Sequence, residues 1–80
     1  MKRVTVRYFA VLREQRGLEE ERVETTAATA AEVYEELRRT HRLALPAGSL
    51  RVAVNHEFKE WGEVIRDGDT LAFIPPFAGG

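Results

Sequence analysis

The stretch TLAFIPPFAGG, residues 70–80, decides the fold, because it joins an alternating strand pattern to two prolines and a double glycine. Pro75 and Pro76 end the strand, since proline fixes φ and cannot donate a hydrogen bond to a sheet. We therefore expect a folded body over residues 1–74 and an extended tail over residues 75–80. Fully extended, such a tail reaches at most about 20 Å, enough to enter the active site of another protein.

The double glycine, Gly79-Gly80, is the most distinctive part of the tail. Glycine has no Cβ, so a Gly-Gly end can pass through a channel too narrow for other residues. Its distinctive chemical group is the α-carboxylate of Gly80. The alternative is an inert, frayed chain end, where small residues commonly collect.

Upstream of the tail, the first third of the chain predicts two strands around a short helix. Residues 2–9 alternate between apolar and polar side chains, as expected of a half-buried strand. Residues 10–16 follow a short helical pattern, and Gly17 suits the positive φ at its C-terminal end. Residues 18–25 predict a weaker strand, whose acidic run 19–21 indicates a solvated turn or edge.

A long amphipathic helix is predicted to begin at Thr29, whose hydroxyl fits a capping box with Glu32. The helix runs to about Arg42, before the break at Pro46. Its residues at helical spacing form one apolar stripe: Ala30, Val33, Tyr34, Leu37 and His41. This stripe requires one apolar face to cover it.

The region between this helix and the tail predicts a hairpin over residues 50–59 with its turn at Asn55-His56. Residues 66–69 form a further turn, so its two aspartates are expected to serve the backbone rather than acid–base chemistry. Trp61 fits either the core or an interface. One helix and four or five strands predict an α+β roll, with the helix packed across a mixed sheet. Central pairing of the first and last strands would aim the tail.

Composition excludes several classes of function. Eighty residues suffice for one small domain, and a formal charge of −1 gives no basic surface for nucleic acid. The absence of cysteine, with two histidines, leaves no metal site at ligand spacing and no thiolate nucleophile. No apolar run approaches membrane-spanning length, and the N-terminus lacks a signal-peptide pattern. We expect a cytoplasmic protein without membrane or nucleic-acid partners.

Three blocks of the sequence resemble the small-subunit family of molybdopterin synthase, which are ubiquitin-like β-grasp sulfur carriers. They are residues 6–14, residues 53–55 and, most specifically, residues 67–80. Residues 18–50 match the family only in pattern. The resemblance implies a ubiquitin-like β-grasp roll, in agreement with the order of elements predicted above.

The resemblance also implies a function in molybdenum cofactor biosynthesis. The carboxylate of Gly80 would be adenylated by a partner related to ubiquitin-activating enzymes, which consumes ATP. A sulfur donor supplied through a cysteine desulfurase would then convert it to a thiocarboxylate. The large subunit of molybdopterin synthase would accept the tail within a heterotetramer, where the sulfur passes to a cyclic pterin precursor. The carrier would bind no cofactor or metal and would not be catalytic alone.

The resemblance assigns partner contacts to the tail and to the N-terminal block. Phe9 and Arg13 match that block, although a packed aromatic and a solvated arginine explain them equally well. The predicted contacts of the C-terminal part are Phe73, Pro75, Pro76, Phe77, Ala78 and Gly79.

Other functions remain open on the sequence. Within the same fold, the chain could carry sulfur for thiamine, cysteine or tRNA thiolation. A ubiquitin-like modifier joined to lysines and an inert interaction domain are alternatives from other classes. The order Ile74-Pro75-Pro76-Phe77 resembles the molybdopterin signature most closely.

Overall fold

A computed structural model of the chain describes residues 1–76. Residues 77–80, which include the predicted sites at Phe77, Ala78, Gly79 and Gly80, lie outside the described part. The described elements, in chain order, are β1 (Lys2–Tyr8), α1 (Val11–Arg16), β2 (Glu20–Thr25), α2 (Ala30–His41), a 3₁₀ turn (Ala47–Ser49), β3 (Arg51–Val54), β4 (Glu57–Lys59) and β5 (Thr70–Ile74). No helix in this described range is long and apolar enough to cross a membrane.

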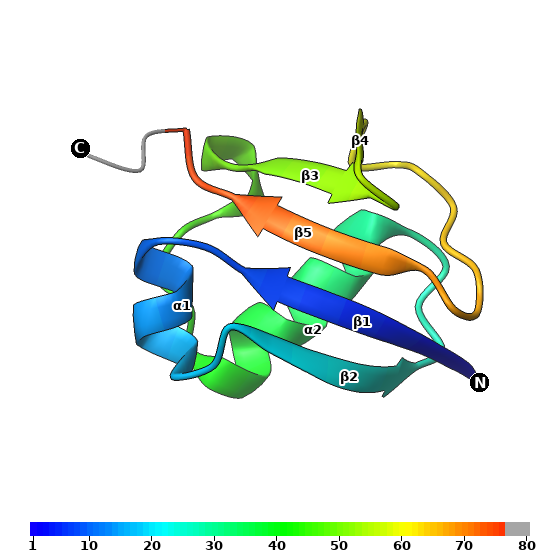
Figure 1. Cartoon of the computed structure of the whole chain (residues 1–80), viewed down its shortest axis with the longest axis horizontal. Coiled ribbons are helices and arrows are strands. Elements are labelled where there is room, and N and C mark those ends of the chain that lie inside the picture. The colour runs from blue at the N-terminus through cyan, green and yellow to red at the C-terminus, as the bar shows by residue number, and fades with distance from the viewer. Residues whose placement is uncertain (77–80) are drawn as a thin grey trace.

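Within residues 1–76 the strands form one five-stranded mixed sheet in the order β2-β1-β5-β3-β4 (Figure 1). β1 and β5 pair in parallel at its centre, from Thr5 opposite Thr70 to Tyr8 opposite Phe73. The other neighbouring pairs are antiparallel. The predicted mixed sheet is confirmed, and the central pairing of the first and last strands, which the sequence left as a condition, is present. The chain therefore leaves β5 from the middle of the sheet.

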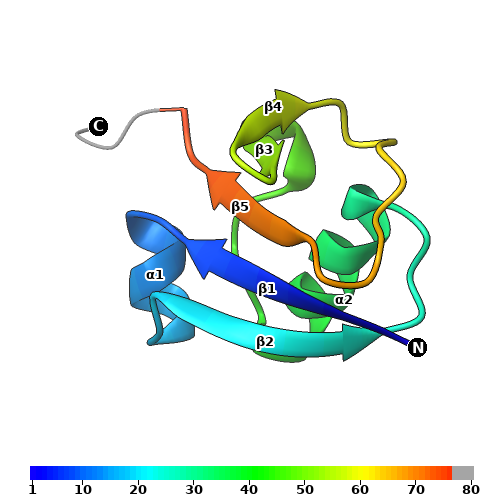
Figure 2. The ribbon, with the colours of Figure 1, turned by 45° about the vertical axis from the view of Figure 1, so that its right-hand side comes forward.

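α2 covers one face of this sheet and leaves the other face open (Figure 2). The predicted stripe is buried at four of its five positions, and His41 at the end of the helix is half-buried. Alternate residues of the strands pack against that stripe. The helical repeat of 3.6 residues and the strand repeat of 2 thus place their apolar side chains at the same interface. The largest fully buried side chains on the strands are Tyr8, Phe73, Leu71, Val4, Val6 and Val52.

Three aromatic rings form the centre of the core. Phe73 of β5 contacts the Tyr34 ring edge-on at 4.9 Å between centroids and stacks on Trp61 at 5.8 Å. Tyr34 donates its hydroxyl to the Leu45 carbonyl at 2.6 Å, so its polar end is satisfied inside the fold. Trp61, which the sequence left open between core and interface, is partly buried and packs on the core.

The predicted caps and turns are present, with one difference at α2. Thr29 Oγ1 accepts from the Glu32 amide at 3.3 Å, but the Glu32 carboxylate accepts from Ala28 N rather than from the Thr29 amide. At the hairpin, Asn55 and His56 have φ of 52° and 74°, the conformation that a tight two-residue turn requires.

The aspartates of the turn before β5 bind backbone and hairpin groups, as predicted. Asp67 Oδ1 accepts from the Arg3 amide at 2.7 Å, and Asp69 Oδ2 accepts from the Arg66 amide at 2.8 Å. Asn55 joins the two turns, because its amide donates to Asp69 and its oxygen accepts from Thr70 N, both at 2.9 Å. These contacts hold the start of β5 to the β3–β4 hairpin.

Glu21 differs from the prediction of a solvated acidic run. β2 is an edge strand as expected, but the Glu21 carboxylate is half-buried and accepts two hydrogen bonds from Arg16, at 2.7 and 2.9 Å. The Tyr8 hydroxyl donates a third. Hydrogen bonding to Arg16 lowers the pKa of Glu21, whereas burial raises the pKa of Tyr8. This cluster fastens α1 to the sheet.

We expect the Glu21→Gln variant to lose about 1–3 kcal/mol of unfolding free energy at pH 7, because Arg16 loses an ionised acceptor. The pKa of Glu21 is depressed on folding. Its stabilisation is therefore present above the unfolded pKa of about 4.3 and is lost as pH falls through the lower folded value. The variant should thus lose less stability than the wild type on acidification through this window.

Urea unfolding at pH 7 and pH 3 measures this difference. Glu24→Gln is the matched control, since the Arg3–Glu24 side chains are 65% and 59% exposed and solvent screens their attraction. An equal effect of the two substitutions would contradict the role assigned to Glu21.

Candidate partner-binding face

The open face of the sheet is divided into a charged part and an apolar part. On the charged part, β1 and β2 align opposite charges across the strands. Arg3 lies 3.2 Å from Glu24, and Arg7 lies 3.6 Å from Glu20. Such cross-strand pairs stabilise the edge and keep it solvated.

The apolar part lies over β5, β3 and β4 and contains a shallow depression of about 210 Å³. Its floor is formed by two small side chains, because the register sets Ala53 of β3 opposite Ala72 of β5. Phe58 of β4 lies opposite Ala53 and forms one wall of the depression. The remaining lining residues are Arg7, Phe9, His56, Thr70 and Ile74.

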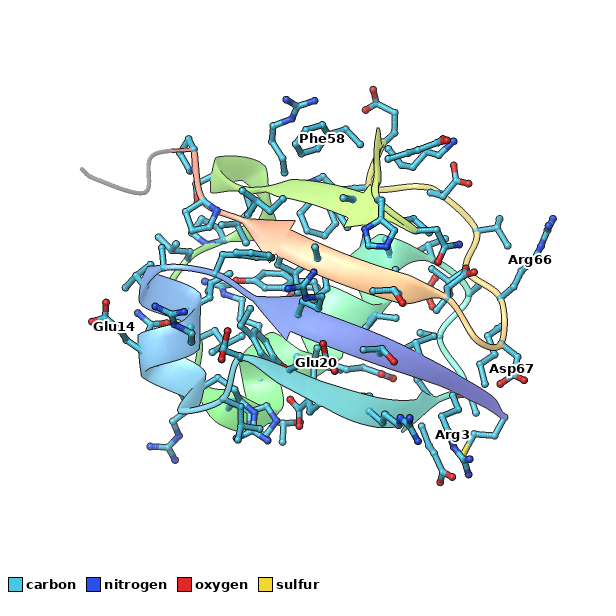
Figure 3. All side chains as sticks on the ribbon, in the orientation of Figure 1. Arg3, Glu14, Glu20, Phe58, Arg66 and Asp67 are labelled. Carbon is cyan, nitrogen blue, oxygen red and sulfur yellow. The ribbon has the colours of Figure 1, made fainter. Side chains whose placement is uncertain are left out.

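Two aromatic side chains of this face are each in contact with an arginine. The Arg51 guanidinium lies 3.8 Å from the Phe58 ring centroid, and the Arg7 guanidinium lies 5.4 Å from that of Phe9. Phe58 remains 53% exposed, and Figure 3 shows it near the β4 edge of the sheet, whereas Glu20 lies toward the β2 edge. An exposed aromatic beside small residues and a cation is typical of a protein-binding surface.

Three of the predicted contact residues lie at the surface, in different surroundings. Phe9 lines the apolar depression and is half-buried, as a partner contact on this face requires. Arg13 is exposed on α1, where it lies 3.8 Å from Glu19, and it does not line the depression. Pro76 is exposed at the end of the described chain.

Two predicted contact residues are buried instead. Phe73 is 0% exposed because its strand position directs the ring toward α2, so the prediction that it contacts a partner is wrong. Pro75 is also buried, so its ring is unavailable to a partner. Phe58 was not among the predicted contact residues, although a large apolar residue between two charged ones in a short hairpin strand is a signal for it.

A mixed sheet with β1 and β5 at its centre, crossed by one main helix and open on its other face, defines the ubiquitin-like β-grasp class. The chain belongs to the ThiS family, whose family model matches residues 6–80. The match therefore spans nearly all of the described residues and the Gly-Gly end of the sequence.

The comparisons agree over nearly the whole chain. A Haemophilus influenzae protein named "Molybdopterin synthase sulfur carrier subunit" is 36% identical, with 96% of this chain and 99% of that protein covered. A putative molybdopterin converting factor subunit 1 from Pyrococcus furiosus has a TM-score of 0.79 at 28% identity, covering 96% and 100% of the two chains. The small archaeal modifier protein 1 of H. volcanii has a TM-score of 0.81 at 26% identity, with 96% and 100% covered.

Proposed function

We propose that this chain is a sulfur carrier subunit of molybdopterin synthase in molybdenum cofactor biosynthesis. The observation that carries the proposal is the 36% identity to the Haemophilus influenzae sulfur carrier subunit over nearly the full length of both chains. The same fold also occurs in a protein named as a modifier, so the fold alone does not select the function.

The chemistry of the proposal takes place on the Gly80 carboxylate. A carboxylate resists nucleophiles because its charge is delocalised, so an adenylyltransferase partner first joins it to AMP from ATP and releases pyrophosphate. A persulfide sulfur, supplied through a cysteine desulfurase, then displaces AMP and forms an acyl disulfide. A thiol reductant attacks the outer sulfur of this disulfide, which leaves a thiocarboxylate on Gly80 and joins the thiol to the donor sulfur in a new disulfide. The thiocarboxylate sulfur is nucleophilic at neutral pH and is delivered to the cyclic pterin precursor.

The carrier contributes the reactive atom and its position, and the large subunit contributes the catalytic groups. The carrier itself holds no cofactor in this mechanism, and we place it in the cytoplasm with its partners. We assign the docking of the large subunit and of the adenylyltransferase to the apolar depression around Phe58 and Phe9. The exit of the chain from β5, which borders this depression, supports docking and tail insertion as one event.

Intact mass of the protein, purified from a cell that makes molybdenum cofactor, tests the function. A mass increase equal to sulfur replacing one oxygen, localised to Gly80 by fragmentation, is the expected result. An isopeptide linkage to lysine would instead assign the chain to the modifiers. A carboxylate that is never converted under these conditions would leave an inert domain and overturn the proposal.

Phe58→Ala should weaken binding to the large subunit about tenfold or more, because its ring is the more exposed of the two aromatic rings that line the depression. Its stability should change little, since half of the side chain is already in water. Calorimetric titration of the purified large subunit measures the affinity. Val64→Ala is the control, since Val64 is 60% exposed and lies outside the depression. Equal affinities of the two variants would remove the docking role of Phe58.

A further inference from the structure

Two arginine–aromatic pairs border the apolar depression on the open face of the sheet. On the β1 side, the Arg7 guanidinium lies over the Phe9 ring, and toward the β4 edge the Arg51 guanidinium lies over the Phe58 ring (Figure 3). The face of an aromatic ring attracts cations, so each guanidinium is held against its ring. The depression thus has a cation at each of two walls.

Only one of these two cations has a counter-ion within residues 1–76. Arg7 lies 3.6 Å from the carboxylate of Glu20, its cross-strand neighbour on β2. Arg51 has no carboxylate within 4 Å in the part of the chain that the structure describes. The lining of the depression, drawn from the same residues, contains no carboxylate either. The Arg7 wall is therefore neutralised and the Arg51 wall is not.

The two carboxylates nearest to β4 in sequence leave Arg51 unneutralised. Glu57 lies opposite Val54, whose side chain is in the core, so strand alternation directs Glu57 to the α2 side of the sheet. Glu60 follows the last residue of β4 and continues its register to the position opposite Arg51. Glu60 and Arg51 are both exposed and form no ion pair, so water screens their attraction.

A partner that covers the exposed Phe58 ring also covers the Arg51 guanidinium, because the guanidinium lies 3.8 Å from the ring centroid. The partner then removes water from a charged group, which is strongly unfavourable when that charge has no counter-ion. Arg7 is covered together with the carboxylate of Glu20, whereas Arg51 requires an anion from the partner. A carboxylate fits this role, since its two oxygens accept in parallel from the N–H groups of a guanidinium.

Arg51 also lies beside the end of the strand from which the tail continues. The register sets it opposite Ile74, the last residue of β5, and Ile74 lines the depression. A carboxylate bound by Arg51 therefore holds a partner against the strand that leads into residues 75–80.

We propose that the large subunit docks with an aspartate or glutamate paired to Arg51, next to an apolar side chain that fills the depression. This inference rests on the proposed function and adds the chemistry of the partner's contact segment. The large subunit is the partner that keeps this face covered in the expected heterotetramer. The ion pair sets the orientation of that subunit, because the Arg7 wall already has its carboxylate.

A second copy of this chain is a poorer source of the carboxylate. On the strands of the open face within residues 1–76, the carboxylates belong to Glu20 and Glu24, which already pair with Arg7 and Arg3. Two open faces pressed together would leave both copies of Arg51 without a counter-ion. The charge pattern therefore favours a different protein.

Calorimetric titration of the purified large subunit with the Arg51→Met variant tests the proposal. Methionine keeps an unbranched apolar side chain beside Phe58 but carries no charge. We expect the affinity to fall about tenfold to a hundredfold, because the partner's carboxylate is left covered without a cation. Affinity should also fall more steeply with added salt for the wild type than for the variant, an effect that a merely structural role of Arg51 would not produce. Arg51→Lys, which keeps the charge, should recover part of the affinity.

Arg22→Met is the matched control for net charge. Arg22 is also exposed, lies on the open face opposite Thr5, and forms no ion pair within residues 1–76. It is outside the depression and three strand spacings from Arg51, at least about 14 Å away. Its affinity for the large subunit should equal that of the wild type, and an equal loss in both variants would refute a local ion pair.

The remaining outcomes separate this inference from the proposed function. If the wild type binds the large subunit and Arg51→Met binds equally well, the inference alone is overturned. If the wild type does not bind the large subunit, the proposed function fails and the inference fails with it. Slower thiocarboxylate formation by Arg51→Met at unchanged affinity for the large subunit would assign the carboxylate to the adenylyltransferase. A concentration-dependent dimer that Arg51→Met disperses would assign this wall to a second copy, and either result overturns the inference.

Discussion

Removal of Gly80 abolishes thiocarboxylate formation and leaves the melting temperature unchanged: this is the expected result with the largest effect on function. The reactive carboxylate would move to Gly79 and fall short, by one residue of about 3.3–3.6 Å, of the position that the activating partner requires. The hydrophobic core of the described residues 1–76 extends from Val4 to Phe73, and glycine has no side chain to add to it, so we expect little change of stability. Intact mass after incubation with the activating enzyme, ATP and sulfur donor measures the reaction.

The control for chain length is a variant with one alanine appended after Gly80. In this variant the Gly80 carbonyl is part of a peptide bond, so it has no carboxylate to adenylate and should be equally inactive. Thermal unfolding of both variants should match the wild type. An appended chain that is loaded with sulfur without being trimmed would refute the proposed chemistry, and a large loss of melting temperature would show that the tail contributes to the core.

Phe73→Ala should give the largest loss of stability, about 3–5 kcal/mol, because it leaves a cavity at the centre of the core. The ring is fully buried and contacts both Tyr34 and Trp61. The free energy of unfolding of such domains is about 5–15 kcal/mol in total, so the variant approaches global unfolding at 37 °C. Urea denaturation measures the loss, provided that the unfolding free energies of variant and wild type fall with urea concentration at the same slope.

Phe73→Leu separates the cavity from the loss of aromatic contacts. It keeps most of the buried apolar volume, so its cost should be well below that of alanine. Phe58→Ala on the open face removes an equal ring and should cost far less stability. If the two Phe→Ala variants lost the same unfolding free energy, the assignment of Phe73 to the core and of Phe58 to the surface would be wrong.

The helix and strands could be predicted because their periodicities report burial directly. The stripe from Ala30 to Leu37 faces the sheet, and alternation along residues 2–9 identified the buried side of β1. Turn chemistry was equally local: Gly17 and Gly68 have φ of 81° and 91°, which few other residues adopt without strain. The central pairing of β1 and β5 was only a condition at the level of the sequence, because local patterns do not specify which strands are neighbours, and the structure shows it.

The site was less predictable, because it depends on registers between distant segments. Alternation placed Leu71 and Phe73 on one face but could not tell whether α2 or a partner covers that face. The depression requires Ala53 to lie opposite both Ala72 and Phe58, which is a property of three strands together. Glu21 was misjudged for a similar reason, since its partners Arg16 and Tyr8 come from two other elements. The roles of Gly79 and Gly80 stay predictions.

The parallel pairing of β1 with β5 also determines how the molecule resists mechanical tension. The two strands run side by side from Thr5–Thr70 to Tyr8–Phe73, with one chain end at each end of the pair. A force that pulls these ends apart loads the interstrand hydrogen bonds in shear, so they must break together rather than unzip one by one. Pulling on the C-terminal segment while the N-terminal end is held therefore loads the domain in its mechanically resistant direction. We expect the carrier to stay folded when its tail is withdrawn from a partner.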